Sequence, residues 1–130
     1  MKNIKKLLQT ILVLIFVSAA PAAFSQTIHI LVGGKKVDRV IYKKKLQVLD
    51  VRTPEEIQEG HLPNAIAYDF KAPGFESKLA ALPRDKAYLV YCRSGGRSAR
   101  TVEMMKNLGF AEVYEMKGGI LAYKGKLVKD

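Results

Sequence analysis

The sequence predicts a single α/β domain in which a central, mostly parallel sheet is flanked by helices on both faces. Two observations support this fold class. Short apolar runs with strand character alternate with helix-like segments between residues 27 and 116, and parallel strands need such crossovers. The chain has 130 residues, of which 48% are hydrophobic, and this suits one domain with a real core. No internal repeat or low-complexity tract indicates a second domain.

The first half of the chain carries two strands and two short helices. A first strand is predicted at residues 27–32, and a glycine turn and a short, lysine-rich helix around residues 37–41 follow it. A second strand is predicted at residues 46–51. Thr53 then caps a helix, with a proline directly after it and Glu56 at the third helical position, a pattern typical of a helix start.

The second half continues the alternation. A strand is predicted at residues 65–69, and a short helix at 77–82 is stopped by the next proline. The most apolar strand is predicted at residues 87–91. After a glycine loop, residues 98–108 form an amphipathic helix closed by a glycine, and residues 112–116 form the last strand.

The only cysteine of the chain, Cys92, lies between a strand and a glycine loop. It directly follows the predicted strand 87–91, and Gly95 and Gly96 break the run shortly afterwards. The thiol is therefore expected at the carboxyl end of a buried strand. Open α/β sheets bind their ligands at this end.

The residues around Cys92 predict a reactive thiolate. Loop amides, the following helix terminus, Arg93 and Arg97 all favour the charged form of sulfur. Thiols in such surroundings have pKa values of roughly 3.5 to 7.5, against about 8.5 for a free thiol. The alternative is a small buried hydrophobe without chemistry. Two glycines and two arginines so near would pack badly in a core, which favours a nucleophile.

Residues 92–98, with the sequence CRSGGRS, resemble the active-site loop of the single-domain rhodaneses, the sulfurtransferase family. Three further segments are similar to signatures of that family and occur in its order. They are LDVRTPEE at residues 49–56, GHLPNA at 60–65 and GGI at 118–120. The resemblance covers about residues 46 to 124 and implies a rhodanese-like α/β fold.

The resemblance also implies an activity. Cys92 would take the sulfane sulfur of a small donor such as thiosulfate, hold it as a persulfide, and pass it to a thiophilic acceptor, cyanide or a thiol. No cofactor is needed besides that covalent persulfide. Asp50 and Arg52 would support the active loop by hydrogen bonds or an ion pair. The residues expected to cradle the sulfur are Arg93, Ser94, Gly95, Gly96, Arg97 and Ser98.

Two alternatives remain open at this point. One is a rhodanese-like module that binds a partner protein without turnover, although relatives of that kind typically lack the cysteine. The other is an enzyme similar to phosphatases or arsenate reductases, whose loops place five residues between cysteine and arginine. Only four residues separate Cys92 from Arg97, and the tighter loop favours sulfur over a tetrahedral oxyanion.

Three further expectations concern single residues. Tyr123 stands where rhodaneses usually have a tryptophan, and we expect it to pack under the active loop. His61 is expected to be structural, with a polar group near Asp69 or a backbone carbonyl as its partner. No metal site is expected, because two scattered histidines and one cysteine lack ligand spacing.

The amino terminus has the pattern of a secretory signal peptide. Lys2, Lys5 and Lys6 precede an apolar stretch at residues 7–17 and a run of small residues. We expect residues 1–25 to be removed before Gln26, which leaves a rhodanese-like domain at residues 26–130. The protein would then be exported, to the periplasm or the medium, without a stable membrane span. An uncleaved anchor is the alternative, but the apolar stretch is short for a span.

The charge balance narrows the range of partners. The net charge of +10 falls to +7 without the three lysines of the leader, and such a field suits anionic donors. No nucleic-acid partner is expected, because no recognition motif accompanies the lysines. An exported chain with one unpaired thiol also implies a redox partner protein that keeps Cys92 reduced or persulfidated.

Overall fold

The computed structural model describes residues 26–130, and the predicted signal peptide lies outside them. The described residues form one five-stranded sheet in the order β1-β5-β4-β2-β3, and every pair in it is parallel. The strands are β1 (Ile28–Gly33), β2 (Gln47–Asp50), β3 (Ile66–Ala67), β4 (Ala87–Tyr91) and β5 (Glu112–Lys117). The predicted α/β class is confirmed, and the sheet is wholly parallel.

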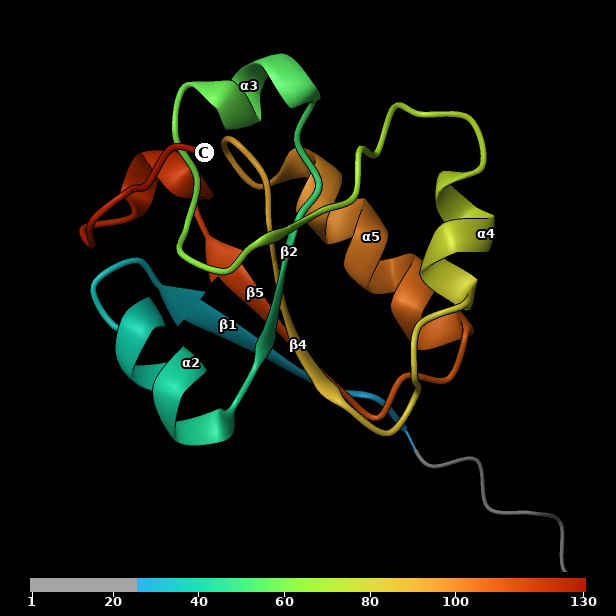
Figure 1. Cartoon of the computed structure of the whole chain (residues 1–130). Helices are drawn as coiled ribbons and strands as arrows, with labels where there is room; N and C mark the ends of the chain where they lie inside the picture. Colours follow the sequence, from blue (N-terminus) through green and yellow to red (C-terminus); the bar gives the residue numbers. More distant parts are fainter. Residues whose placement is uncertain (1–25) are drawn as a thin grey trace, which may run out of the picture.

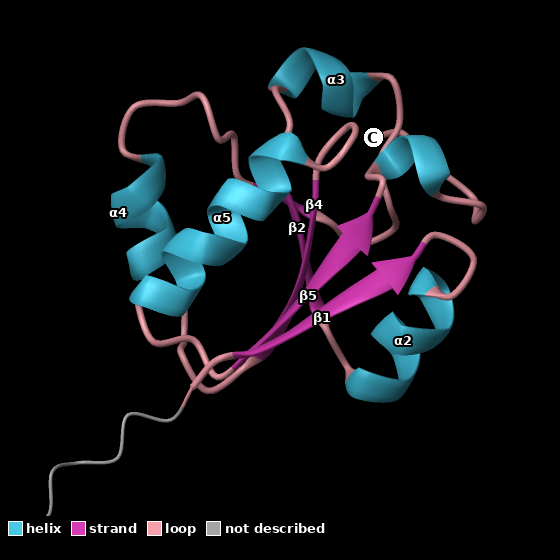
Figure 2. Ribbon diagram, turned by 180° about the vertical axis from the view of Figure 1, so that it is seen from behind, coloured by secondary structure: helices cyan, strands magenta, loops and turns pink. Residues whose placement is uncertain are grey.

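Helices cover both faces of this sheet, as Figures 1 and 2 show. The helices are α2 (Val37–Lys44), α3 (Pro54–Gln58), α4 (Phe75–Ala80) and α5 (Gly96–Asn107), and a 3₁₀ turn spans Ile120–Ala122. The α4 and α5 helices lie on one face and α2 lies on the other, whereas α3 lies beyond the carboxyl ends of the strands (Figure 1). Within residues 26–130, no helix has the length and apolar character that crossing a membrane requires.

The central strand β4 separates two hydrophobic cores. Its Tyr88 and Val90 pack in the core under α4 and α5, and its Leu89 and Tyr91 pack in the core under α2. All four side chains are fully buried. A strand covered on both faces is a continuous apolar run, which explains why its limits agree with the sequence prediction. The strand carries Cys92 to the centre of the sheet's carboxyl edge.

Most elements differ from the sequence prediction by one to three residues at an end; α2, for example, runs to Lys44 instead of about residue 41. Helix α5 begins at Gly96 instead of residue 98, because the Gly95 carbonyl already accepts the first helical bond, from the Ala99 amide at 3.0 Å. Helix α4 begins two residues early, at the buried Phe75. Strand β3 is only two residues long, since it forms the sheet edge and pairs with β2 alone.

The start of α3 follows the sequence prediction. The Thr53 hydroxyl accepts a bond from the Glu56 amide at 3.4 Å, and the Glu56 carboxylate accepts one from the Thr53 amide at 2.9 Å. These reciprocal bonds form a capping box. The box fixes the Glu56 side chain at the helix end that faces the cysteine loop.

Candidate active site

Cys92 lies at the end of β4, where the loop that follows folds around its sulfur. The Gly95 amide donates to Sγ at 3.1 Å, and the Ser98 hydroxyl lies 3.5 Å from it. Cys92 is 1% exposed, and Ser98 is fully buried. The loop residues Arg93, Ser94 and Gly96 are exposed. Of the predicted loop residues, Ser94, Gly95 and Ser98 therefore bond to the sulfur.

The surroundings of Cys92 favour its thiolate. Burial opposes a negative charge and tends to raise the pKa of Cys92. Hydrogen bonds from the Ser98 hydroxyl and from loop amides outweigh this effect, so the pKa is lowered from its ordinary value. The amino end of α5 begins within the same loop and adds its dipole.

Of the two loop arginines expected to favour the thiolate, Arg97 interacts with Cys92, although its main partner is a carboxylate. Arg97 forms a bidentate ion pair with Glu56 of α3, and both N–O distances are 2.8 Å. Its bonds to the carboxylate lower the pKa of Glu56 to about 2. The attraction between Arg97 and Cys92 is a smaller influence on the pKa of Arg97 than the Glu56 bond. Arg93 is exposed.

Glu56 is one of the residues whose contribution to this site sequence reasoning missed. Its position in the capping box was recognisable, but its ion pair spans 41 residues. No local pattern reports such a partner. The pair ties α3 to the cysteine loop and thereby fixes the position of Arg97.

The segment after β5, which begins with Gly118 and Gly119, packs against the other side of the cysteine loop. The Cys92 carbonyl accepts a bond from the Ile120 amide at 2.9 Å, and the Arg93 carbonyl accepts one from the Leu121 amide at 3.2 Å. Gly119 has a φ of 63°, and a Cβ there would lie 2.3 Å from the Arg93 carbonyl oxygen. Only glycine permits this approach.

Asp50 and Arg52 form a buried ion pair at the end of β2. The Arg52 guanidinium donates to the Asp50 carboxylate, with an Nη2–Oδ2 distance of 2.7 Å, and the Tyr91 hydroxyl donates to the same carboxylate. Arg52 also donates to the carbonyls of Glu56 and Gly60. The pair therefore holds α3 and the following turn, and its bonds in the described chain do not reach Sγ. This agrees with a supporting position for both residues.

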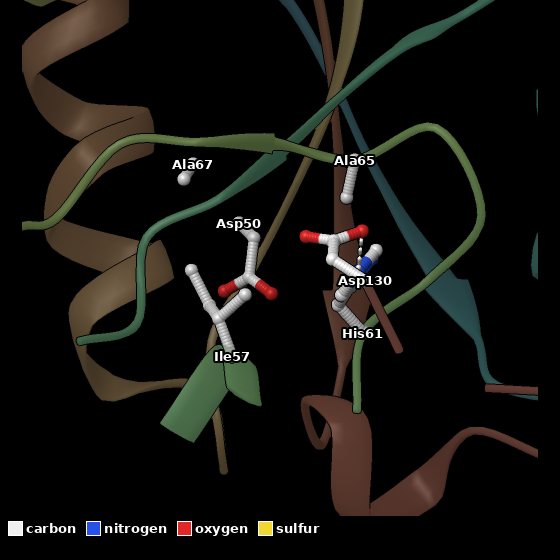
Figure 3. A pocket seen from close by; sticks show the side chains of 6 residues that line it. All are labelled: Asp50, Ile57, His61, Ala65, Ala67 and Asp130. Atoms are coloured by element: carbon white, nitrogen blue, oxygen red, sulfur yellow. Dashed lines mark hydrogen bonds and ion pairs between the residues drawn. The ribbon is translucent and has the colours of Figure 1, made fainter. Parts of the chain in front are cut away.

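His61 lies across a small cavity from Asp50, as Figure 3 shows. The cavity measures about 50 Å³. Nδ1 of His61 lies 2.8 Å from the Leu62 carbonyl, and Nε2 lies 3.0 Å from the Asp130 carboxylate. Of the two expected partners, the backbone carbonyl is found, and the carboxylate that bonds to His61 is that of Asp130 instead of one near Asp69.

This arrangement predicts a small dependence of stability on pH. The bond to the Leu62 carbonyl, and secondarily Asp130, raise the pKa of His61. The contribution of protonated His61 to the free energy of unfolding is fully present below the unfolded-state pKa of about 6.5. It is lost as the pH rises through the folded-state pKa. Because Asp130 is exposed, we expect less than about 1 kcal/mol. Thermal unfolding at several pH values should show this dependence disappear in His61→Gln, and an unchanged dependence would contradict it.

Tyr123 was expected under the active loop and lies elsewhere. Its ring belongs to the core under α2, and its hydroxyl donates to the Asp38 carboxylate of α2 at 2.6 Å. Burial, and then Asp38, raise the pKa of Tyr123. The hydroxyl explains the position, because a tyrosine needs a polar partner when buried and Asp38 supplies one.

A cleft of about 290 Å³ opens beside the cysteine loop. Its lining combines charged and apolar side chains. The charged ones are Arg52, Arg93, Glu56 and Glu59, and the apolar ones are Ile120, Leu121 and Leu127. Among residues 26–130, no cluster of histidine, cysteine and acidic side chains has the geometry to hold a metal ion. The cleft therefore places charged groups of both signs beside the loop that holds Cys92.

Comparisons with known proteins agree with this geometry. The family model of the rhodanese-like domain matches residues 34–126. A sulfurtransferase of Allochromatium vinosum is 32% identical over 76 residues, which cover 58% of this chain and 69% of that protein. The tRNA uridine(34) hydroxylase of Rickettsia akari is 32% identical over 93 residues, but the match covers only 38% of that longer protein and 68% of this chain.

A solved structure shows the same fold. The rhodanese-related protein of Thermoplasma volcanium superposes with a TM-score of 0.66 at 30% sequence identity, and the match covers 81% of this chain and 99% of that one. A sheet of this order with a cysteine loop at its carboxyl edge, together with the family match, defines the class of protein. The chain belongs to the family of rhodanese-like domains.

Proposed function

We propose that this protein is a sulfurtransferase that carries sulfane sulfur as a persulfide on Cys92. The observation that carries the proposal is the position of Sγ, which is buried, contacted by the Gly95 amide at 3.1 Å and by Ser98, and next to the start of α5. Such a site stabilises negative charge on sulfur. The sulfurtransferase among the relatives supports the same chemistry.

The reaction has two balanced steps. The Cys92 thiolate attacks the outer sulfur of thiosulfate, a new S–S bond forms, and sulfite leaves with the electron pair of the broken bond. Cyanide or a thiol then attacks the outer sulfur of the persulfide. Cyanide is thereby converted to thiocyanate and a thiol to its persulfide. In both cases the Cys92 thiolate is regenerated. No cofactor is required.

Different groups of the loop and its neighbours contribute to different parts of this reaction. The loop amides and the α5 terminus hold the negative charge, first on Sγ and then on the outer sulfur. The Arg97–Glu56 pair and the Gly119 contact keep the loop in shape. Arg93 provides a positive charge in the neighbouring cleft, which suits an anionic donor such as thiosulfate.

The proposal extends to the setting of the enzyme. Residues 1–25 have the pattern of a signal peptide, so we place the protein outside the cytoplasm, in the periplasm or the medium. The single thiol then needs a redox partner that keeps it reduced or persulfidated. Both statements rest on the sequence pattern.

A turnover assay tests the function against its alternatives. The purified protein is supplied with thiosulfate and cyanide, and thiocyanate is measured; in parallel it is supplied with p-nitrophenyl phosphate. We expect catalytic thiocyanate formation and no phosphate release. Phosphate release without thiocyanate would favour the phosphatase-like alternative. If neither product forms with any sulfane donor, the protein is a binding module.

A further inference from the structure

A buried carboxylate that the proposed reaction does not use lies behind the active cysteine. Glu115 is 7% exposed, although it carries a charge in the middle of β5. It faces α5, on the same side of the sheet as the buried Val113. Burying a carboxylate costs folding free energy unless the group is paired and hydrogen-bonded. The partners of Glu115 therefore indicate its role.

Glu115 has one partner on each oxygen. Its Oε1 lies 3.4 Å from the Ser98 hydroxyl, and its Oε2 lies 2.9 Å from Nε2 of His29 on β1. Ser98 is in turn 3.5 Å from Sγ of Cys92. A continuous chain of polar contacts therefore runs from the edge strand β1 to the reactive sulfur.

The Ser98 hydroxyl is the shared element of this chain. It has one proton and three acceptors within reach, namely the Gly95 carbonyl at 3.0 Å, the Glu115 carboxylate at 3.4 Å and the Cys92 sulfur at 3.5 Å. A hydroxyl can donate that proton to only one acceptor at a time. An ionised carboxylate is the stronger kind of acceptor, and each donation to it withdraws a hydrogen bond from the thiolate.

We propose that Glu115 is a positioning residue that opposes negative charge on the Cys92 sulfur by competing for the Ser98 hydroxyl. Its own charge, two hydrogen bonds from Sγ, acts in the same direction. His29 fixes the carboxylate from the other side and offsets its charge when protonated. The proposal concerns the same site as the proposed function, but it does not depend on which reaction Cys92 performs.

Other charged groups lie in the loop and in the elements next to it. They are Arg93 in the loop, Arg97 on α5, its partner Glu56 on α3, the Asp50–Arg52 pair at the end of β2, and Glu115 with His29 on β5 and β1. The carboxylates of Glu56 and Asp50 are each neutralised by an arginine at 2.8 Å or less. Glu115 is the acidic group whose partner is a histidine and whose hydroxyl contact is shared with Cys92.

The test is the pH profile of Cys92 alkylation by iodoacetamide in the full chain. Cys92 is the only cysteine, so the label reports one site. The midpoint of the profile reports the thiolate, because limited access lowers all rates by the same factor. In Glu115→Gln the amide can donate to Ser98 and turn its proton toward sulfur. We expect the midpoint to fall by about one pH unit.

Measuring the effect of Glu115→Gln in both the parent and Ser98→Ala shows whether Glu115 acts through the Ser98 hydroxyl or through a general change of structure. In Ser98→Ala the midpoint should rise, and adding Glu115→Gln there should shift it much less than in the parent. Equal shifts in both backgrounds would overturn the role of Ser98. Glu112→Gln, on the same strand but bonded to Tyr114, should leave the midpoint unchanged.

The remaining outcomes are also decisive. An unchanged or raised midpoint in a folded Glu115→Gln variant would overturn the proposal. If that variant does not fold, Glu115→Asp replaces it, because the shorter side chain keeps the negative charge but places it farther from the Ser98 hydroxyl. The midpoint of alkylation should then fall by less than in Glu115→Gln. No fall would overturn the proposal. Since alkylation needs no sulfur donor, these results are independent of whether thiocyanate forms.

Discussion

Replacing Cys92 by serine is expected to lower thiocyanate formation by at least about a thousandfold. A hydroxyl at this position cannot hold a persulfide, and its oxygen stays protonated at neutral pH. The loop amides and the α5 terminus remain in place, but they have no sulfur to stabilise. The comparison is made as kcat/KM for thiosulfate and cyanide, with parent and variant prepared side by side.

The fold should tolerate this change. Serine is close to cysteine in shape, and Cys92 makes its contacts through the Gly95 amide and the Ser98 hydroxyl, both of which can bond an oxygen. The melting temperature of Cys92→Ser should therefore stay close to that of the parent. A variant that remains folded and still produces thiocyanate at the parental rate would remove Cys92 from the mechanism.

Replacing Arg52 by methionine should produce the largest loss of stability, about 3–5 kcal/mol. Asp50 is 1% exposed, and the Arg52 side chain supplies its opposite charge at 2.7 Å. Methionine fills much of the space but leaves an uncompensated buried carboxylate. The Glu56 and Gly60 carbonyls also lose their donor. Urea unfolding monitored by circular dichroism gives the difference in free energy.

Two further variants make this prediction specific. Arg52→Met combined with Asp50→Asn removes both charges and should be more stable than Arg52→Met alone. Arg100→Met removes an equal charge from an exposed position of α5 and should change stability by less than about 0.5 kcal/mol. If Arg52→Met unfolds at the same urea concentration as Arg100→Met, the buried pair does not support the site.

The parts of the fold that the sequence predicted well are those set by local composition. Strand β4 was predicted within its observed limits because its residues are apolar and buried on both faces. The capping box of α3 was recognisable from Thr53 and Glu56, which bond within one turn. The cysteine loop was located for the same reason, since strand, loop and helix are contiguous.

The parts that were missed depend on contacts between distant residues. The pairing of Arg97 with Glu56 and that of His29 with Glu115 span 41 and 86 residues, and no local pattern encodes them. The start of α5 was placed two residues late because glycines predict a loop, whereas the Gly95 carbonyl already serves as a helical acceptor. Tyr123 was misplaced because its hydroxyl partner, Asp38, lies 85 residues away.

The intact mass of the protein after incubation with thiosulfate shows directly whether Cys92 holds a persulfide. We expect a gain of one sulfur, about 32 Da, on the parent and none on Cys92→Ser. Addition of cyanide should remove that mass and release an equal amount of thiocyanate. A parent protein that gains no sulfur from thiosulfate or any other sulfane donor, or one whose gain persists in Cys92→Ser, would contradict the account.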